Sequence, residues 1–280
     1  MESLKRTPDV QTFTPVPAKI VAKKEFTEKE TIFSMELPEG MSLHHKPLQF
    51  VMVSIFGLGE APISITSSPS EDNTFDLCVR RVGVLTEALH AMSPGDLVGV
   101  RGPFGNGAIL ENIPGRDLLF VAGGLGLAPL RSLINQTAEH RDFAGNVTIL
   151  YGCKNPEEQL FLDDIAKWRD DPSIEFHQTV DVADESWKGN VGVITTLFDR
   201  IKINPRTTTP VICGPPIMYK FVIMKLLAMG IPERRIYMSL ERRMRCGLGR
   251  CGHCQINGVY VCQEGPVFTY ADAKKFKEAL

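Results

Sequence analysis

Residues 120–129 read FVAGGLGLAP, and this stretch decides the fold class of the second half of the chain. The preceding run 118–122, LLFVA, is entirely apolar, as expected for a strand buried on both faces of a parallel sheet. A turn with Gly123, Gly124 and Gly126 follows, and apolar residues then recur at helical spacing. Glycines allow close backbone approach and a helix N-terminus attracts anions, so the turn predicts a nucleotide phosphate site. A plain strand–helix turn is the alternative, because the stretch departs from G-x-G-x-x-G.

Strands alternate with helices through the rest of this half, which predicts a parallel α/β sheet. The further strands are predicted at Val147–Tyr151, Ile174–Thr179 and Pro210–Cys213. Helices are predicted after the glycine turn, from the cap Asn155 through Trp168, and from Met218 to Met229 before Gly230. The segment Cys213-Gly214-Pro215 ends a strand and is expected at the carboxyl edge of the sheet, where ligands bind. Core packing is the alternative role for Cys213.

Toward the N-terminus the pattern changes to short strands separated by turns, which predicts a small antiparallel barrel. The predicted strands are Lys19–Ala22, Thr31–Leu37, Gln49–Ile55, Phe75–Val79 and Leu97–Arg101. Residues 1–17 are polar, contain prolines and are expected to form an extended arm. We therefore divide the chain into an arm (1–17), a barrel (18–111), an α/β domain (112–237) and a cysteine-rich module (238–280).

Two barrel segments have the composition of a phosphate-ligand site. Residues 60–68, EAPISITSS, form a hydroxyl-rich strand end, and Arg80 and Arg81 close another strand. Gly83 and Thr86 then lead into a predicted short helix, an arrangement that favours an anion. Surface arginines on a solvated strand are the alternative interpretation.

The cysteine-rich module has the spacing Cys246-x4-Cys251-x2-Cys254-x7-Cys262. This order is the plant-type [2Fe–2S] spacing, and the Asn-Gly turn within 255–260 predicts a hairpin that brings the fourth cysteine to the others. A four-cysteine structural zinc site and four free cysteines are the alternatives. Residues 269–280 are predicted to form a closing helix.

Composition excludes several classes of protein. The chain has 280 residues, 43% hydrophobic and 23% charged, with a net charge of −2, so it is neither disordered nor a generic nucleic-acid binder. No apolar run is long enough to span a bilayer, and the N-terminus lacks the apolar core of a signal peptide. We therefore expect a cytoplasmic protein without membrane insertion.

Together these motifs resemble the ferredoxin–NADP reductase superfamily, in the branch that has a C-terminal [2Fe–2S] module. That branch includes the electron-transfer subunit of dihydroorotate dehydrogenase, the beta subunit of anaerobic sulfite reductase and the gamma subunit of sulfhydrogenases. The segments that carry the resemblance are 240–244 (LERRM) before Cys246, 265–268 (GPVF), 60–64 (EAPIS) and 214–218 (GPPIM).

The resemblance implies FAD on the barrel, NAD(P)(H) on the α/β domain and a cluster on the four cysteines. The positions assigned to FAD are Ala61, Pro62, Ile63, Ser64, Val79, Arg80, Gly83, Leu85 and Thr86. The positions assigned to NAD(P) are Gly123, Gly124, Gly126, Ala128, Pro129, Cys213, Gly214 and Pro215, with Cys213 near the nicotinamide. Ala61 stands where the family's flavin motif has arginine, so Arg80 is expected to supply the missing phosphate contact.

The implied function is electron transfer between NAD(P)H, FAD and the cluster, to or from a partner redox subunit. A hydrogenase, a sulfite reductase or a heterodisulfide-reductase-like unit fits as the partner. Two alternatives stay open at this point: a stand-alone NAD(P)H:acceptor reductase and a zinc-bearing, nucleotide-sensing module. The choice between NAD and NADP also stays open.

Overall fold

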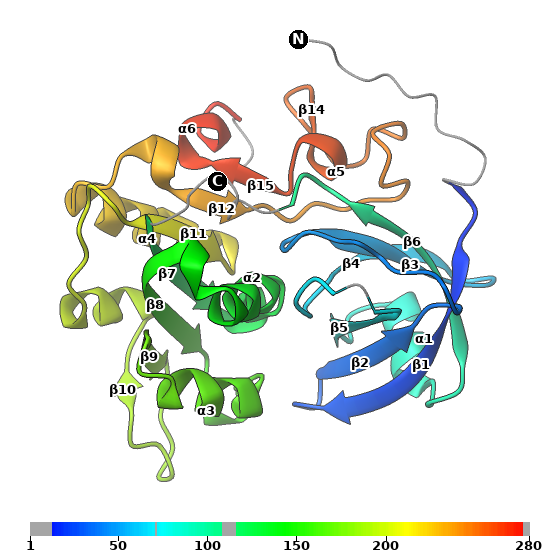
Figure 1. Ribbon diagram of the computed structural model, residues 1–280, viewed down its shortest axis with the longest axis horizontal. Helices are drawn as coiled ribbons and strands as arrows, with labels where there is room; N and C mark the ends of the chain where they lie inside the picture. Colours follow the sequence, from blue (N-terminus) through cyan, green and yellow to red (C-terminus); the bar gives the residue numbers. More distant parts are fainter. Residues whose placement is uncertain (1–12, 71, 108–115, 277–280) are drawn as a thin grey trace.

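The computed structural model describes residues 13–70, 72–107 and 116–276, and Figure 1 shows a barrel beside an open sheet, with the cysteine-rich module above them. The first twelve residues of the predicted arm and the expected boundary at 111/112 lie outside the described residues. Among the described helices, none has the length and apolar character needed to cross a membrane.

The N-terminal half forms the predicted antiparallel barrel. Its strands are β1 (Val16–Glu25), β2 (Glu30–Glu36), β3 (Phe50–Ile55), β4 (Gly59–Ser64), β5 (Thr74–Arg80) and β6 (Leu97–Phe104). They are ordered β4-β3-β6-β1-β2-β5, and a bridge from Ile65 to Leu77 closes the sheet between its two ends. Alternate side chains such as Phe33, Met35 and Val53 fill the interior, because neighbouring residues of a strand point to opposite faces. Helix α1 (Val84–Ala91) buries Leu85 and Leu89.

The second half forms the predicted parallel-rich sheet. Its strands are β7 (Arg116–Gly123), β8 (Ala144–Cys153), β9 (Ile174–Val180), β10 (Asn190–Val191), β11 (Thr209–Cys213), β12 (Tyr237–Ser239) and β15 (Val267–Thr269). Their order is β10-β9-β8-β7-β11-β12-β15, and β15 runs antiparallel to β12.

Helices cover both faces of this sheet. Helices α2 (Leu127–Glu139) and α3 (Leu162–Asp170) share one apolar core with Phe120 and Ile149, whereas α4 (Pro216–Ala228) shares the other core with Val121 and Ile212. Successive residues of β7 therefore all become buried, which explains its uninterrupted apolar run. In Figure 1, α2 lies on the side of the sheet that faces the barrel.

The helix predicted from Asn155 through Trp168 is wrong in extent. Asn155 does cap a turn, with its side chain accepting from the backbone N–H of Glu158, but that turn ends after one 3-10 segment. Helix α3 begins later because Phe161 adopts a left-handed φ of 56°, which interrupts the helix.

The cysteine-rich module is tied into the second sheet. It contains β13 (Gln255–Ile256), β14 (Val259–Tyr260), α5 (Val261–Glu264) and α6 (Tyr270–Ala273). The predicted hairpin is present, since Ile256 pairs with Val259 and both turn residues have positive φ. The predicted closing helix over 269–280 is only the single turn α6 in the described part, and residues 277–280 lie outside it. The expected boundary at 237/238 falls inside β12, whose partner β15 comes from this module.

Candidate functional site

Two strand–helix turns meet at the carboxyl edge of the second sheet. β7 and β11 are parallel neighbours, and Ala122 pairs with Cys213. A Cβ added to Gly126 would lie 2.2 Å from the carbonyl oxygen of Cys213, so a residue with a side chain cannot be accommodated there without a shift. The predicted nucleotide segments 123–129 and 213–215 are thus brought side by side.

Gly124 has more open space around it than Gly126, which packs between the two turns. Its φ is +52°, and an added Cβ would meet nothing within 4 Å. An open backbone at the start of a thirteen-residue helix fits a nucleotide phosphate. Ala128 and Pro129 are buried within α2, so packing of the helix explains their side chains.

The Cys213 side chain is enclosed in the protein. It is 1% exposed, and burial raises the pKa of its thiol to about 12. Tyr219 and Ser239 lie beside the thiol, and the Tyr219 hydroxyl donates to the Ser239 carbonyl oxygen. Cys213 is therefore a neutral thiol at ordinary pH, and its position near a nicotinamide remains a prediction.

The flavin segment predicted at Ala61–Ser64 forms most of β4. All of its residues are half-buried, and β3 pairs with only one edge of the strand. The second predicted flavin segment, Val79 and Arg80, is less accessible at its first residue, because Val79 is only 1% exposed and packs in the barrel core. Arg80 pairs through Nε with the buried carboxylate of Glu30, and the Arg80 side chain keeps 41% exposure. A phosphate contact from Arg80 remains a prediction that has to coexist with this ion pair.

The start of α1 forms a turn held by Thr86. Its hydroxyl accepts hydrogen bonds from the N–H groups of Val82 and Gly83, at 2.9 and 3.0 Å, and donates to the Gly83 carbonyl oxygen. A Cβ on Gly83 would meet open space. The fit to a phosphate therefore rests on the open first turn of α1, with the Thr86 hydroxyl as its support and Leu85 buried behind it.

The four predicted cluster ligands are near neighbours in the fold. Cys251 lies close to Cys246, and Cys262 lies close to both Cys254 and Cys246. Nowhere in the described ranges do three His, Cys, Asp or Glu side chains lie in an arrangement suited to a single metal ion. Two cysteines for each of two irons is the ligand requirement of a [2Fe–2S] cluster.

Backbone N–H groups of the loop 246–254, which we call the cysteine loop, also donate to the cysteine sulfur atoms. The N–H of Leu248 donates to Cys246 Sγ at 3.3 Å, and that of Gly249 donates to Cys262 Sγ at 3.0 Å. Such bonds stabilise charged sulfur, so the donor set and its surroundings fit an iron–sulfur cluster. His253 is exposed and its Nδ1 faces the Cys251 carbonyl oxygen.

Arg101 joins the barrel to the cysteine loop. Its side chain is 4% exposed, and its Nη2 donates to the Glu60 carboxylate at 2.6 Å. Its Nη1 donates to the carbonyl oxygen of Cys246 at 3.1 Å. Phe104, three residues further along β6, also packs against this loop, because a Cβ on Gly247 would lie 2.8 Å from its ring.

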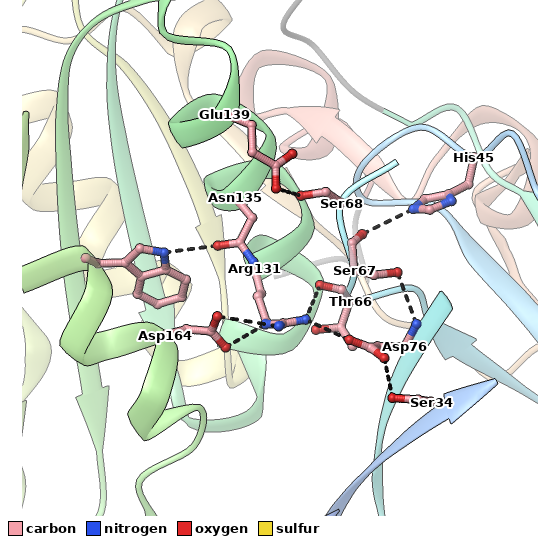
Figure 2. A network of polar contacts seen from close by, with 11 residues as sticks. Ser34, His45, Thr66, Ser67, Ser68, Asp76, Arg131, Asn135, Glu139 and Asp164 are labelled. Carbon is pink, nitrogen blue, oxygen red and sulfur yellow. Dashed lines mark hydrogen bonds and ion pairs between the residues drawn. The ribbon is translucent and has the colours of Figure 1, made fainter. Parts of the chain in front are cut away.

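A second arginine joins the barrel to the nucleotide domain. Arg131, on α2, donates to the Thr66 carbonyl oxygen at 3.1 Å (Figure 2). The segment 60–66 therefore contacts the cysteine loop at its start and the nucleotide domain at its end. Sequence reasoning missed both arginines; the signal available was a charged residue inside a buried pattern, at 101 in LVGVRGPF and at 131 between Leu130 and Ser132.

Comparison with known families covers most of the chain. Residues 17–108 match the oxidoreductase FAD-binding domain, residues 120–223 the oxidoreductase NAD-binding domain, and residues 241–274 the iron-sulfur cluster binding domain of dihydroorotate dehydrogenase B. The chain thus combines FAD-, NAD- and iron–sulfur-binding domains, and the expected cofactor classes are confirmed.

Relatives match over nearly their whole length. The chain is 41% identical to the sulfhydrogenase 2 gamma subunit of Pyrococcus furiosus, over 91% of this chain and 95% of that protein. It is 35% identical to a probable dihydroorotate dehydrogenase B (NAD(+)) electron transfer subunit of Methanocella arvoryzae, over 90% of each. A solved structure of an NADH-dependent reduced ferredoxin–NADP oxidoreductase superposes with a TM-score of 0.73 at 28% identity, covering 90% of this chain and 88% of that one. The chain therefore belongs to the family of ferredoxin–NADP reductase-like oxidoreductase subunits with a C-terminal iron–sulfur domain, the family of the sulfhydrogenase gamma and dihydroorotate dehydrogenase B electron transfer subunits.

Proposed function

We propose that this chain is an electron-transfer subunit that moves electrons between NAD(P)H, FAD and a [2Fe–2S] cluster, and onward to a partner redox subunit. The observation that carries the proposal is the position of residues 60–66. This one segment, which contains the predicted flavin motif, bonds through Arg101 to cluster ligand Cys246 and through Arg131 to the nucleotide domain. These contacts support an order in which the flavin lies between the nucleotide and the cluster.

That order suits the chemistry of the bound groups. A nicotinamide exchanges a hydride, a [2Fe–2S] cluster exchanges one electron, and a flavin can do both. The residues of this chain supply placement: the open turn at Gly124 receives the nucleotide, β4 and the start of α1 receive the flavin, and Cys246, Cys251, Cys254 and Cys262 hold the irons. No side chain is required as an acid or base.

The partner is proposed to be a second redox enzyme, since the relatives are named as subunits. Identity of 41% with a sulfhydrogenase gamma subunit favours a hydrogenase-type partner over a sulfite-reductase or heterodisulfide-reductase-like one. A thiolate-ligated cluster suits a reducing compartment, which supports a cytoplasmic location.

Anaerobic titration of the full chain tests the proposal. Protein purified with its cofactors is expected to contain about one FAD, two irons and two sulfides per chain, and NADH or NADPH should bleach flavin and cluster absorbance together. Protein from which FAD has been removed should keep an oxidised cluster after NAD(P)H is added, because a hydride cannot pass to a one-electron centre. Stoichiometric zinc, or cluster reduction without FAD, contradicts the proposal.

A further inference from the structure

Arg131 is shared between the barrel and the nucleotide domain. Its side chain is 14% exposed, and Figure 2 shows its guanidinium between acceptors from both sides. Nε donates to Asp164 Oδ2 of α3 at 2.8 Å, while Nη1 donates to the Thr66 carbonyl oxygen at 3.1 Å and to Asp76 Oδ2 at 3.3 Å. Asp164 belongs to the nucleotide domain, whereas Thr66 and Asp76 belong to the barrel. One planar group therefore fixes the two domains relative to each other.

The acceptors on the barrel side are themselves held in place. Ser34 Oγ donates to the other carboxylate oxygen of Asp76 at 2.7 Å, and the Asp76 N–H donates to Ser67 Oγ at 3.0 Å (Figure 2). The guanidinium also lies over the ring of Phe161, at 5.2 Å from its centroid. The planar guanidinium of Arg131 has oriented acceptors on both sides, so it fixes the distance between the barrel and the nucleotide domain. A flexible lysine–carboxylate contact would not fix this distance.

Other polar contacts between the same two domains are at the surface. Lys24 pairs with Asp163 where both side chains are more than half exposed, and the half-buried Ser68 donates through its hydroxyl to the exposed Glu139 at 3.1 Å. Exposed pairs of this kind contribute little to a fixed geometry. Phe26 packs edge-on against Phe161 and adds apolar contact area between the domains. This contact is less directional than the hydrogen bonds of Arg131.

The position of Arg131 in the chain couples both cofactor segments. It lies five residues after Gly126 on the helix that the nucleotide turn opens, and its acceptor Thr66 lies two residues after Ser64 of β4. We propose that Arg131 is a positioning residue for hydride transfer, which holds the nicotinamide turn at its working distance from the flavin strand. The inference rests on the proposed function. The transfer concerned moves one hydride, with its two electrons, from reduced nicotinamide to oxidised flavin.

The test compares Arg131→Met with Arg131→Lys in the full chain with its cofactors. Misplacement by about 1 Å costs roughly a hundredfold in rate, so Arg131→Met should slow flavin reduction at saturating NADH by about 10- to 100-fold. The dissociation constant for NADH should change by less than about threefold, and the charge-transfer absorbance of the nucleotide–flavin complex should weaken. Arg131→Lys should restore part of the rate, since it keeps the charge but loses the fork.

Arg169→Met is the matched control. Arg169 also stacks on an aromatic ring, Phe176, at 5.2 Å and hydrogen-bonds to Gln178, but these contacts all lie inside the nucleotide domain. Its flavin reduction rate should equal that of the wild type. If Arg131→Met fails to fold, Asp76→Ala replaces it; this variant removes the carboxylate acceptor on the barrel side and leaves the Thr66 carbonyl oxygen, so a smaller loss of rate is expected.

Two results would overturn the inference. One is an unchanged limiting rate in Arg131→Met; the other is an equal loss in Arg169→Met. Dithionite should reduce flavin and cluster normally in every variant. Failure of NAD(P)H to reduce the flavin in wild-type protein would instead contradict the proposed function, so the two failures are distinguishable.

Discussion

Gly124 leaves its side of the nucleotide turn open, which gives the first residue-scale prediction. Gly124→Val should abolish reduction by NADH and NADPH, because the side chain fills the space beside the turn. Reduction by dithionite should persist, since flavin and cluster occupy other segments. Stopped-flow absorbance under anaerobic conditions measures both.

The control for this variant separates space from backbone strain. Gly40 also has a positive φ, +78°, and nothing within 4 Å of an added Cβ, but it lies in a barrel turn remote from the nucleotide segments. Gly40→Val therefore incurs a similar conformational cost, about 1–2 kcal/mol. Normal NADH reduction in Gly124→Val, or an equal loss in Gly40→Val, would show that the nucleotide binds elsewhere.

The buried thiol of Cys213 gives a prediction about pH. Burial raises its pKa from 9.0 to about 12 in the folded chain. Between these values the unfolded chain loses the proton and the folded chain keeps it, so the free energy of unfolding falls as pH rises. The stability of wild type relative to Cys213→Ala should therefore drop by about 1 kcal/mol from about pH 8 to about pH 10.

Urea denaturation of both proteins at the two pH values measures this difference, and groups common to both proteins cancel. A stability difference that stays constant with pH would show that the thiol ionises as readily in the folded chain as in the unfolded chain.

At the scale of elements, β4 and β6 connect the flavin segment to the cluster loop through Arg101. Arg101→Met leaves Glu60 without its partner and the Cys246 carbonyl without a donor, so we expect a loss of about 2 kcal/mol in stability, reduced because Glu60 is 31% exposed. Iron should be lost at lower urea concentrations than FAD. Absorbance at cluster and flavin wavelengths during denaturation follows both.

Lys19→Met is the comparison for this element. The Lys19–Glu36 pair also bridges two barrel strands, but its side chains are 48% and 33% exposed, so its loss should change stability by less than about 1 kcal/mol. Iron and FAD leaving together in Arg101→Met would mean that Arg101 stabilises the barrel alone.

At the scale of the whole molecule, the loop 246–254 and strand β15 are held in place by different interactions. The loop 246–254 contains three of the four predicted ligands, whereas β15 pairs with β12 and is fixed by Asn106, whose side chain donates to the carbonyl oxygens of Glu264 and Val267. Removal of iron should therefore expose loop amides to hydrogen exchange and leave β15 protected. Hydrogen exchange with mass spectrometry, before and after chelation, measures this, and simultaneous loss of protection in β15 would contradict it.

The sequence by itself determined the elements whose pattern is local. The apolar run of β7 and the Asn-Gly hairpin each depend on neighbouring residues, and both agree with the structure. The cysteine spacing is local in the same way, and the ligand set drawn from it stays a prediction. The left-handed Phe161 delays the start of a predicted helix, because its conformation is set by packing against Phe26 and Arg131 from distant segments.

Only the tertiary structure decided how the three cofactor segments are joined. The full extent of β4 is set by its pairing with β3. Arg101 and Arg131 donate hydrogen bonds to acceptors that lie 41 and 65 residues away in sequence. Such contacts cannot be read from the periodicity of the sequence. A single buried arginine changes only one position in a stretch whose other residues are mostly apolar, so the hydrophobic pattern stays the same. The cofactor classes are therefore readable from motifs, whereas the order in which the cofactor segments touch follows from the folded chain.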